Sequence, residues 1–288
     1  MMASTAMSHG GTAPEPVSDD ASPLAPIGRR ELRTDIPHPA RVYDCFLGGK
    51  DNFAPDRKLA DRIRAAVPTV PEMARANRAF MQRATEYLVA EAGIRQFLDI
   101  GTGIPTEPNL HQVAQRIAPE TRVVYVDNDP IVLVHARALL ISTPQGRCAY
   151  LDADLNDPIE ILDSQEVAVT LDLDKPVAVT FGSILMLLPD AADPWAKVET
   201  LMEAMPAGSH LVVSHPTADF NTDAMAEVVT ATSATGITFV PRPREEVERF
   251  FTGCELVPPG LVPVLAWRPD QTPMDPQTAY YWAGVARK

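Results

Sequence analysis

An aspartate followed by two closely spaced glycines is the part of this sequence best suited to binding a ligand. Asp99 follows Phe97 and Leu98 and precedes Gly101 and Gly103. Glycines at this spacing allow a tight turn without a steric penalty from Cβ, so backbone N–H groups can approach a bound molecule. A carboxylate next to such a turn can accept charge-assisted hydrogen bonds. The competing interpretation is an ordinary glycine turn between a strand and a helix.

Two further aspartates follow short apolar runs downstream. Residues 121–127 form a β-branched run that ends in Asp127, and residues 148–155 contain a third run followed by Asp154. Taken singly, each aspartate is more typical of a solvated loop or a helix cap. Taken together, three strand ends that each carry an aspartate predict one ligand site at the edge of a sheet.

The pattern Asp-x-Gly-x-Gly at residues 99–103 resembles motif I of the class I S-adenosylmethionine-dependent methyltransferases. A dinucleotide-binding loop would carry Gly-x-Gly-x-x-Gly, and the third glycine position is occupied here by Thr106, which disfavours a nicotinamide-dependent oxidoreductase. The resemblance implies S-adenosylmethionine as cofactor. It assigns Asp99 to the ammonium group of the cofactor, with Gly101 and Gly103 making room for the ligand. It assigns Asp127, with its neighbour Asn128, to the ribose hydroxyls, and Asp154 to the adenine amino group.

A second resemblance lies between Ala40 and Arg57, where an amphipathic stretch is broken by two glycines and followed by polar residues. The sequence Arg-Val-Tyr-Asp at residues 41–44, followed by Leu-Gly-Gly-Lys-Asp-Asn-Phe at residues 47–53, resembles the N-terminal signature of a bacterial family. That family was long labelled a domain of unknown function and is now grouped as an S-adenosyl methyltransferase family. Its pattern Phe-Leu-Asp-Ile-Gly-Thr-Gly-x-Pro-Thr also accommodates Pro105. The resemblance covers nearly the whole chain after the first residues and leaves the methyl acceptor open.

Polar residues on the N-terminal side extend the predicted site. A turn at Gly48-Gly49 places Lys50 and Asn52 where they could cover the cofactor pocket, and the alternative is a helix C-cap followed by a solvated loop. A helix is predicted over residues 72–92. Arg78 on this helix is the better candidate, beside Arg75, for binding the methionine carboxylate, against the alternative of a solvated basic face.

Two predicted strands contribute candidates on the acceptor side. Residues 176–188 read as a buried strand that runs into a loop, with Ser183 lining the site. His215 stands at the end of a strand predicted over residues 210–216 and is the catalytic candidate, as a general base. A hydrogen-bonded structural histidine is the more common role, and methyl transfer from a sulfonium can proceed by alignment alone. The (Asn/Asp)-Pro-Pro-aromatic motif of many amide and amine methyltransferases is absent.

The elements that must position these residues alternate between strands and helices. We therefore predict an α/β fold, a Rossmann-like doubly wound sheet of the class I methyltransferase type. The sheet is expected to be mainly parallel, with one antiparallel strand near the C-terminus. The predicted organisation is a disordered tail at residues 1–27, an N-terminal helical cap at residues 28–94 and a cofactor-binding domain at residues 95–288.

Composition narrows the classes of partner. The chain of 288 residues has 25 Lys and Arg against 38 Asp and Glu, a net charge of −13, which argues against a dedicated nucleic-acid or anionic-membrane binder. Cys45, Cys148 and Cys254 are widely separated, so neither a disulfide framework nor a metal site is predicted. The absence of a continuous apolar segment and the few cysteines favour a cytoplasmic protein.

These observations together predict an S-adenosylmethionine-dependent methyltransferase that acts on a small-molecule acceptor, with a homodimer as a possible assembly. A different class stays open: a sensor or interaction protein of the same fold that binds S-adenosylmethionine or S-adenosylhomocysteine without catalysis. The fold requires no particular catalytic residue, so sequence does not separate these alternatives.

Overall fold

The computed structural model describes residues 1, 33–139, 141–271 and 275–288. The predicted disordered tail at residues 1–27 lies outside the described residues, apart from Met1. Residues from Leu32 to Lys288 belong to one compact unit. A boundary between cap and cofactor domain at residue 94 therefore stays a prediction.

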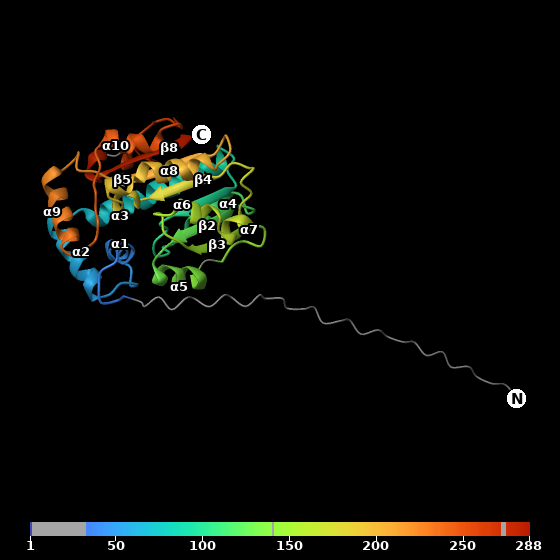
Figure 1. Ribbon diagram of the computed structural model, residues 1–288, viewed down its shortest axis with the longest axis horizontal. Helices are drawn as coiled ribbons and strands as arrows, with labels where there is room; N and C mark the ends of the chain where they lie inside the picture. The colour runs from blue at the N-terminus through green and yellow to red at the C-terminus, as the bar shows by residue number, and fades with distance from the viewer. Residues whose placement is uncertain (2–32, 140, 272–274) are drawn as a thin grey trace. The chain divides into compact units, whose positions relative to one another are not determined.

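An eight-stranded sheet forms the centre of this unit (Figure 1). The strand order is β3-β2-β1-β4-β5-β8-β6, and β7 also pairs with β8. Strands β1 to β5 are parallel, whereas β8 pairs antiparallel with β5, β6 and β7, so the prediction of one reversed strand near the C-terminus is confirmed. The strands are β1 (Gln96–Ile100), β2 (Arg122–Asp127), β3 (Arg147–Asp152), β4 (Ala178–Gly182), β5 (His210–Pro216), β6 (Glu255–Leu256), β7 (Val262–Pro263) and β8 (Tyr281–Arg287).

Helices cover both faces of the sheet and connect its parallel strands. The helices are α1 (Pro39–Leu47), α2 (Ala54–Ala66), α3 (Val70–Ala90), α4 (Leu110–Ile117), α5 (Pro130–Leu139), α6 (Pro158–Leu162), α7 (Gln165–Thr170), α8 (Pro194–Glu203), α9 (Thr222–Ser233) and α10 (Arg244–Glu248). Sequence analysis did not anticipate α5 or α7 as separate helices. None of the helices in the described residues is both long and apolar enough to cross a membrane.

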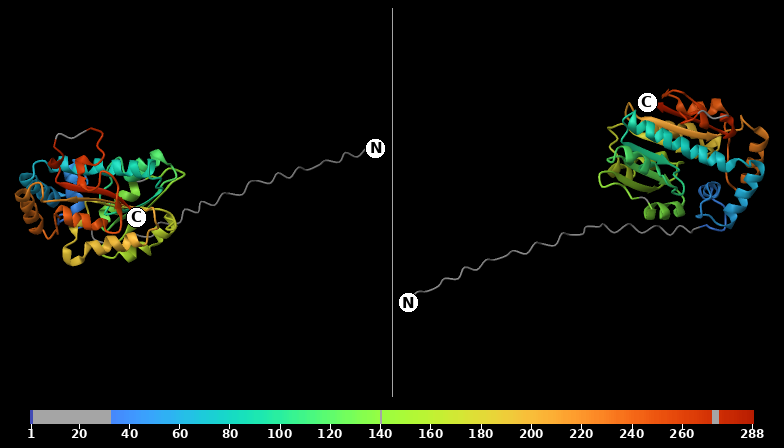
Figure 2. Two further views of the ribbon diagram at one scale, coloured as in Figure 1. Left: turned by 90° about the horizontal axis from the view of Figure 1, so that it is seen from above. Right: turned by 180° about the vertical axis from the view of Figure 1, so that it is seen from behind.

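Side chains of each central strand alternate between the two faces, as a pleated strand requires. Phe97 on β1 and Val123 on β2 pack with helix α3, whereas Leu98 and Val124 pack on the opposite face with α8. Figure 2, in its view from behind, shows α3 lying across the first of these faces. The apolar runs that predicted buried strands thus form two cores, one on each side of the sheet.

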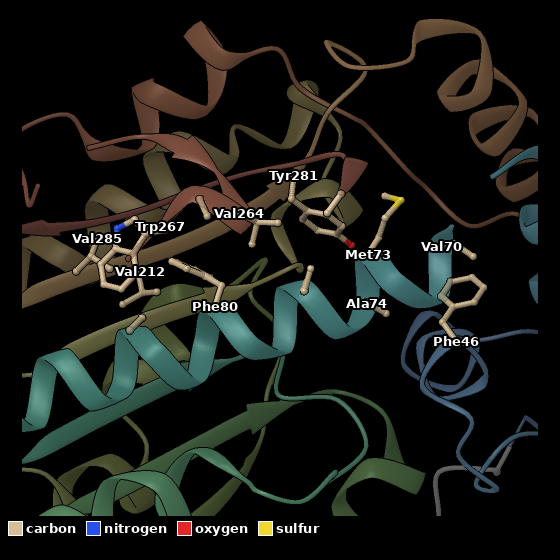
Figure 3. Close-up of a cluster of buried hydrophobic side chains, with 14 of the residues drawn as sticks. Phe46, Val70, Met73, Ala74, Phe80, Val212, Val264, Trp267, Tyr281 and Val285 are labelled. Atoms are coloured by element: carbon tan, nitrogen blue, oxygen red, sulfur yellow. The ribbon is translucent and has the colours of Figure 1, made fainter. Parts of the chain in front are cut away.

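The core on the α3 face extends along the whole helix (Figure 3). Near the middle of the helix, Phe80 packs edge-on against Trp267, with ring centroids 5.4 Å apart. Near its start, Met73 and Val70 lie near Phe46 of α1. Helix α3 therefore links the strands to the N-terminal helices, which pack beside α9.

A buried ion pair holds the first segment of the described chain on helix α2. Arg41 Nε lies 3.5 Å from Asp56 Oδ1, and both side chains are almost completely buried. The Asp56 carboxylate also accepts hydrogen bonds from the backbone N–H groups of His38 and Phe53, at 2.9 and 2.7 Å. Because removing one partner would leave a buried charge uncompensated, this pair fixes the position of the segment that leads into α1.

Candidate functional site

A cavity of about 460 Å³ lies at the carboxyl ends of β1, β2 and β4. This is the edge of a doubly wound sheet where ligands generally bind. Eight of the residues predicted for the site line the cavity: Arg78, Asp99, Gly101, Gly103, Asp127, Asn128, Asp154 and Ser183. Lys50, Asn52 and His215 are not among its lining residues. The parallel register that pairs Ile100 with Val126 brings the first two strand ends together.

Asp99 is held at the bottom of the cavity by two hydroxyl groups. Thr102 donates to Asp99 Oδ2 at 2.8 Å, and Thr180 of the neighbouring strand β4 donates a short hydrogen bond to Oδ1. Burial raises the pKa of the Asp99 carboxyl, and the hydrogen bonds from Thr180 and Thr102 oppose that shift. Each oxygen retains a lone pair, so the carboxylate can accept a further hydrogen bond from a cationic ligand group.

The two glycines after β1 have different surroundings. Gly101 has φ +68°, and a Cβ at this position would lie 2.4 Å from Ile184 Cγ1. Gly103 has φ +67°, but a Cβ there would have no atom within 4 Å. Both backbone conformations favour glycine. The space at Gly101 is filled by the protein itself, whereas the space at Gly103 is open to the cavity.

Asp127 is oriented by backbone N–H groups from both sides. Gly103 donates to its Oδ2 at 2.8 Å, and Asp129 donates to its Oδ1 at 2.9 Å. Burial raises the pKa of Asp127, and these two hydrogen bonds lower it again in part. The carboxylate has further lone pairs for two donors, which fits the adjacent hydroxyls of a ribose.

His38 connects this strand end to the segment before α1. Its Nδ1 lies 2.9 Å from Asp129 Oδ2, and both residues are close to Asp127. Burial alone would raise the pKa of Asp129, but the hydrogen bond and charge of His38, together with the Ile131 backbone N–H and Arg41, make the net shift downward. Sequence analysis did not identify His38 or Asp129. The only sequence signal was that His38 and Asp129 lie close in the chain to the motifs at residues 41–53 and 121–128.

Asp154 lies two residues beyond β3 on the exposed rim of the cavity. Asn128 Nδ2 donates to Asp154 Oδ2 at 3.2 Å, and Asn156 donates to Oδ1 from its backbone N–H at 2.8 Å. Asn128 and Asp154, which were predicted as separate contacts, therefore form one hydrogen-bonded pair. Their exposure leaves room for a ligand amino group.

Arg78 lines the cavity and shapes the loop after the glycine turn. Its Nη2 donates to the carbonyl oxygens of Thr106 and Pro108, the latter at 3.0 Å. The guanidinium also lies close enough to Asp99 to lower the pKa of that carboxyl. Arg75, the alternative carboxylate binder, is exposed and paired with Glu72 at 2.7 Å. The geometry therefore favours Arg78 over Arg75 as the residue that faces a ligand.

The Gly48-Gly49 turn is organised around Asp44, which itself lines the cavity. Asn52 Nδ2 donates to Asp44 Oδ2 at 2.7 Å, and the Asp51 backbone N–H donates to the same oxygen at 3.0 Å. Lys50 is exposed. This turn resembles the predicted alternative of a helix C-cap, since Gly48 has φ 79° at the end of α1.

His215 is fully buried and both of its ring nitrogens have partners. Arg242 Nη1 lies 3.1 Å from His215 Nε2, and because an arginine only donates, Nδ1 carries the proton and donates to the Pro216 carbonyl at 2.8 Å. Burial, with the Arg242 charge, lowers the pKa of His215 to about 3. This environment favours the structural interpretation of His215 over the general-base interpretation.

Arg242 was not identified from the sequence. It is fully buried and donates to the carbonyl oxygens of Leu185 and Leu188 at 3.1 and 2.8 Å, and to Asp190 Oδ1 at 2.6 Å. It therefore fixes the loop that follows β4 against the end of β5. The only sequence signal was an arginine between two prolines.

A second, smaller cavity of about 80 Å³ adjoins the first on the side of α1 and α9. Ser183, which follows β4, lines both cavities. It has φ 59°, an uncommon value for a residue with a side chain, and its Oγ lies 3.0 Å from the Tyr281 hydroxyl. The loop at residues 235–238 after α9 also lines the larger cavity. No short motif predicts that this loop belongs to the site, because its place there depends on how distant segments pack.

Comparisons with known proteins give the family and the fold of the chain. Residues 27–288 match the model of a family described as S-adenosyl methyltransferase. A crystal structure of a DUF574 family protein from Streptomyces avermitilis is 46% identical, with a TM-score of 0.87, over 90% of this chain and 100% of that one. A candidate methyltransferase from Thermobifida fusca is 39% identical, with a TM-score of 0.82, over 89% of this chain and 97% of that one.

A more distant comparison concerns the fold alone. An O-methyltransferase family protein from Burkholderia thailandensis is 13% identical, with a TM-score of 0.50, over 76% of this chain and 60% of that one. Among curated proteins, none matches the sequence.

Proposed function

This chain belongs to the S-adenosyl methyltransferase family and is an S-adenosylmethionine-dependent methyltransferase, and on that premise we propose that it methylates a small molecule inside the cavity described above. The observation that carries the proposal is the convergence of Asp99, Asp127 and Asp154 on one cavity at the ends of three neighbouring strands. These three aspartates form the proposed cofactor contacts without an aspartate from another strand end.

The residues present fit the cofactor at each of its three parts. Asp99 would accept from the ammonium group, and Arg78 would donate to the carboxylate, because these opposite charges lie side by side in the cavity. Asp127 has lone pairs free for two ribose hydroxyls. Asn128 and Asp154 form an exposed hydrogen-bonded pair that suits the adenine edge. The open space at Gly103 leaves room for the ligand to pass close to the backbone.

When bound, S-adenosylmethionine would supply a methyl group on a sulfonium: an acceptor lone pair would form the new bond to the methyl carbon, the carbon–sulfur electron pair would stay on the departing sulfur, and the acceptor proton would be released to solvent once the site opens. The chain itself contributes alignment and exclusion of solvent. Arg242 holds the loop after β4, Ser183 places its hydroxyl at the cavity wall, and the segment around His38 covers the opposite side. His215 has no part in this account.

The enclosing elements support a small acceptor. Residues 36–40, one face of α1 at Tyr43, Asp44 and Leu47, and residues 235–238 line the cavity, so an acceptor must fit between them and the sheet. The net charge of −13 also disfavours nucleic acid as the acceptor. The free cysteines and the bacterial origin of the two similar structures support a bacterial protein of the cytoplasm. A homodimer stays a prediction.

The test of this proposal is turnover of S-adenosylmethionine in the presence of the small-molecule fraction of a bacterial extract. We expect S-adenosylhomocysteine to form faster with the extract than without it, and a methylated product to appear by mass spectrometry. Binding of S-adenosylmethionine without turnover in any extract fraction would instead support the non-catalytic sensor. Turnover only with a fraction of macromolecules would contradict the small-molecule acceptor.

A further inference from the structure

The second cavity has the shape and chemistry of an acceptor compartment. We infer that it receives the apolar part of the methyl acceptor, and that the acceptor is an uncharged, largely apolar small molecule with one hydroxyl or amino group at the junction of the two cavities. The inference rests on the proposed function. It goes further by naming the class of the acceptor and the residues that select it.

The lining of this compartment carries no charge. Its walls come from α1, α2, the first turns of α3, and α9, and the side chains are aliphatic, aromatic or hydroxyl-bearing. Val70, Met73, Met225 and Val228 are buried members of these walls. An unpaired charge placed there would lose its hydration without a partner, so carboxylates, phosphates and ammonium groups are disfavoured.

The two cavities are continuous in their walls. Six residues line both of them, and they come from α1, from the loop after β4 and from the segment after α9: Pro39, Tyr43, Ser183, Met186, Leu187 and Ile237. A molecule in the smaller cavity would therefore lie beside the end of β4, where the larger cavity begins. This shared wall, built by Ser183 and its neighbours, is what places the smaller cavity next to the cofactor space.

The hydrogen-bonding groups at this junction are not fully used. The Ser183 and Tyr281 hydroxyl oxygens lie 3.0 Å apart, and one hydroxyl donates its proton to the other. Among the interactions of the described residues, the remaining proton has a partner only if Ser183 carries it, namely the weak acceptor Met186 Sδ at 3.9 Å. The pair can thus donate to a ligand heteroatom and accept from its O–H or N–H. A neutral hydroxyl or amine matches both roles.

Two other hydroxyl groups in the walls are already satisfied. The Tyr43 hydroxyl donates to the Ala74 carbonyl at 3.0 Å and accepts from Asn77 Nδ2 at 3.0 Å. Thr232 Oγ1 donates within α9. Figure 3 shows the Tyr281 hydroxyl directed toward Met73 on α3. The polar contact for an acceptor is therefore concentrated at Ser183 and Tyr281.

The first test measures binding of small probes to the full-length protein saturated with S-adenosylhomocysteine. Phenol and benzoate have similar rings but differ in charge at neutral pH. By ligand-detected NMR titration, we expect phenol to bind about tenfold or more tightly than benzoate. Val228→Phe should fill the compartment and weaken phenol binding about tenfold. Val229→Phe, the same change on the neighbouring and less buried position of α9, should leave it within about twofold.

The second test removes one hydroxyl of the Ser183 and Tyr281 pair and adds no atoms to the cavity. Tyr281→Phe should weaken phenol binding severalfold but leave benzene binding unchanged, because only phenol can use the lost hydroxyl. Benzene serves as the probe of the apolar walls alone. Circular dichroism and titration with S-adenosylhomocysteine establish that each variant is folded.

The outcomes distinguish the two proposals. If wild-type protein does not bind S-adenosylhomocysteine, the proposed function fails before the acceptor is considered. If it binds S-adenosylhomocysteine but takes benzoate as well as phenol, the acceptor class inferred here is wrong. Phenol binding that is unaffected by both Val228→Phe and Tyr281→Phe would likewise overturn the assignment of this compartment.

Discussion

The two parts of the site are built in contrasting ways. The cofactor side consists of charged and backbone groups at the ends of three adjacent strands, and most of its residues lie in short continuous stretches. The acceptor side consists of uncharged side chains from α1, α2, α3, α9, the segment after α9, the loop after β4 and the start of β8. A charged ligand group needs specific partners at fixed positions, whereas an apolar group needs only a dry surface of suitable shape. We therefore expect single substitutions on the cofactor side to have larger effects than single substitutions on the acceptor side.

The largest effect on stability is expected at the first glycine of the turn. Gly101→Ala combines a left-handed backbone conformation with a Cβ 2.4 Å from Ile184, and we expect it to lower the free energy of unfolding by about 2–4 kcal/mol. Met225→Leu in the apolar compartment conserves volume and should cost less than about 1.5 kcal/mol. Denaturant unfolding measures both values, and equal losses would contradict the contrast.

A substitution at the second glycine, Gly103, separates an effect on stability from an effect on binding. Gly103→Ala should cost only about 1–2 kcal/mol, since its Cβ meets no atom within 4 Å. The same Cβ would project into the cofactor space, so affinity for S-adenosylhomocysteine should fall much more than stability does. A variant that loses stability without losing affinity would show that Gly103 serves the fold alone.

A smaller effect on stability is expected from the charge on Asp99, and its size depends on pH. Burial raises the pKa of Asp99 in the folded state, so the ionised form costs stability above that pKa and costs nothing below the pKa of the unfolded chain. Asp99→Asn keeps the shape, and one of the two threonine hydroxyls, Thr102 or Thr180, can reorient to accept from the amide nitrogen while the other still donates to the amide oxygen.

We therefore expect the ligand-free Asp99→Asn variant to melt at a higher temperature than wild type at neutral pH. The difference should shrink as pH falls toward the carboxyl range. Thermal unfolding at several pH values measures this difference, and a stabilisation that grows on acidification would contradict the sign. Binding of S-adenosylmethionine should weaken in the same variant, because the ammonium loses its charged partner.

The same contrast explains what could be predicted from the sequence. The apolar run before Asp99 and the β-branched run before Asp127 predicted the strands, the glycine turn and the mainly parallel sheet, because each signal lies within a few residues. His38 could not be found in this way. Its relation to Asp129 depends on packing between segments about ninety residues apart.

His215 and Lys50 show what residue type and local spacing leave undetermined. A histidine at a strand end and a lysine beside two glycines have residue types suited to chemistry, but burial against Arg242 and exposure on a helix cap decide what they can do. Neither environment is visible in local spacing. The apolar compartment was likewise hidden, since its walls have the composition of an ordinary core.

The most direct test of the account is isothermal titration of S-adenosylhomocysteine into wild-type protein, Asp127→Ala and the control Asp61→Ala. Asp127→Ala would remove the hydrogen bonds to the ribose as well as those from Gly103 and Asp129. Asp61 is an exposed residue of α2, and its ion pair within the described part of the chain is with Arg64. We predict a loss of affinity of about a hundredfold for Asp127→Ala and no change for Asp61→Ala. Equal affinity in all three proteins would contradict the assignment of the cofactor site to these strand ends.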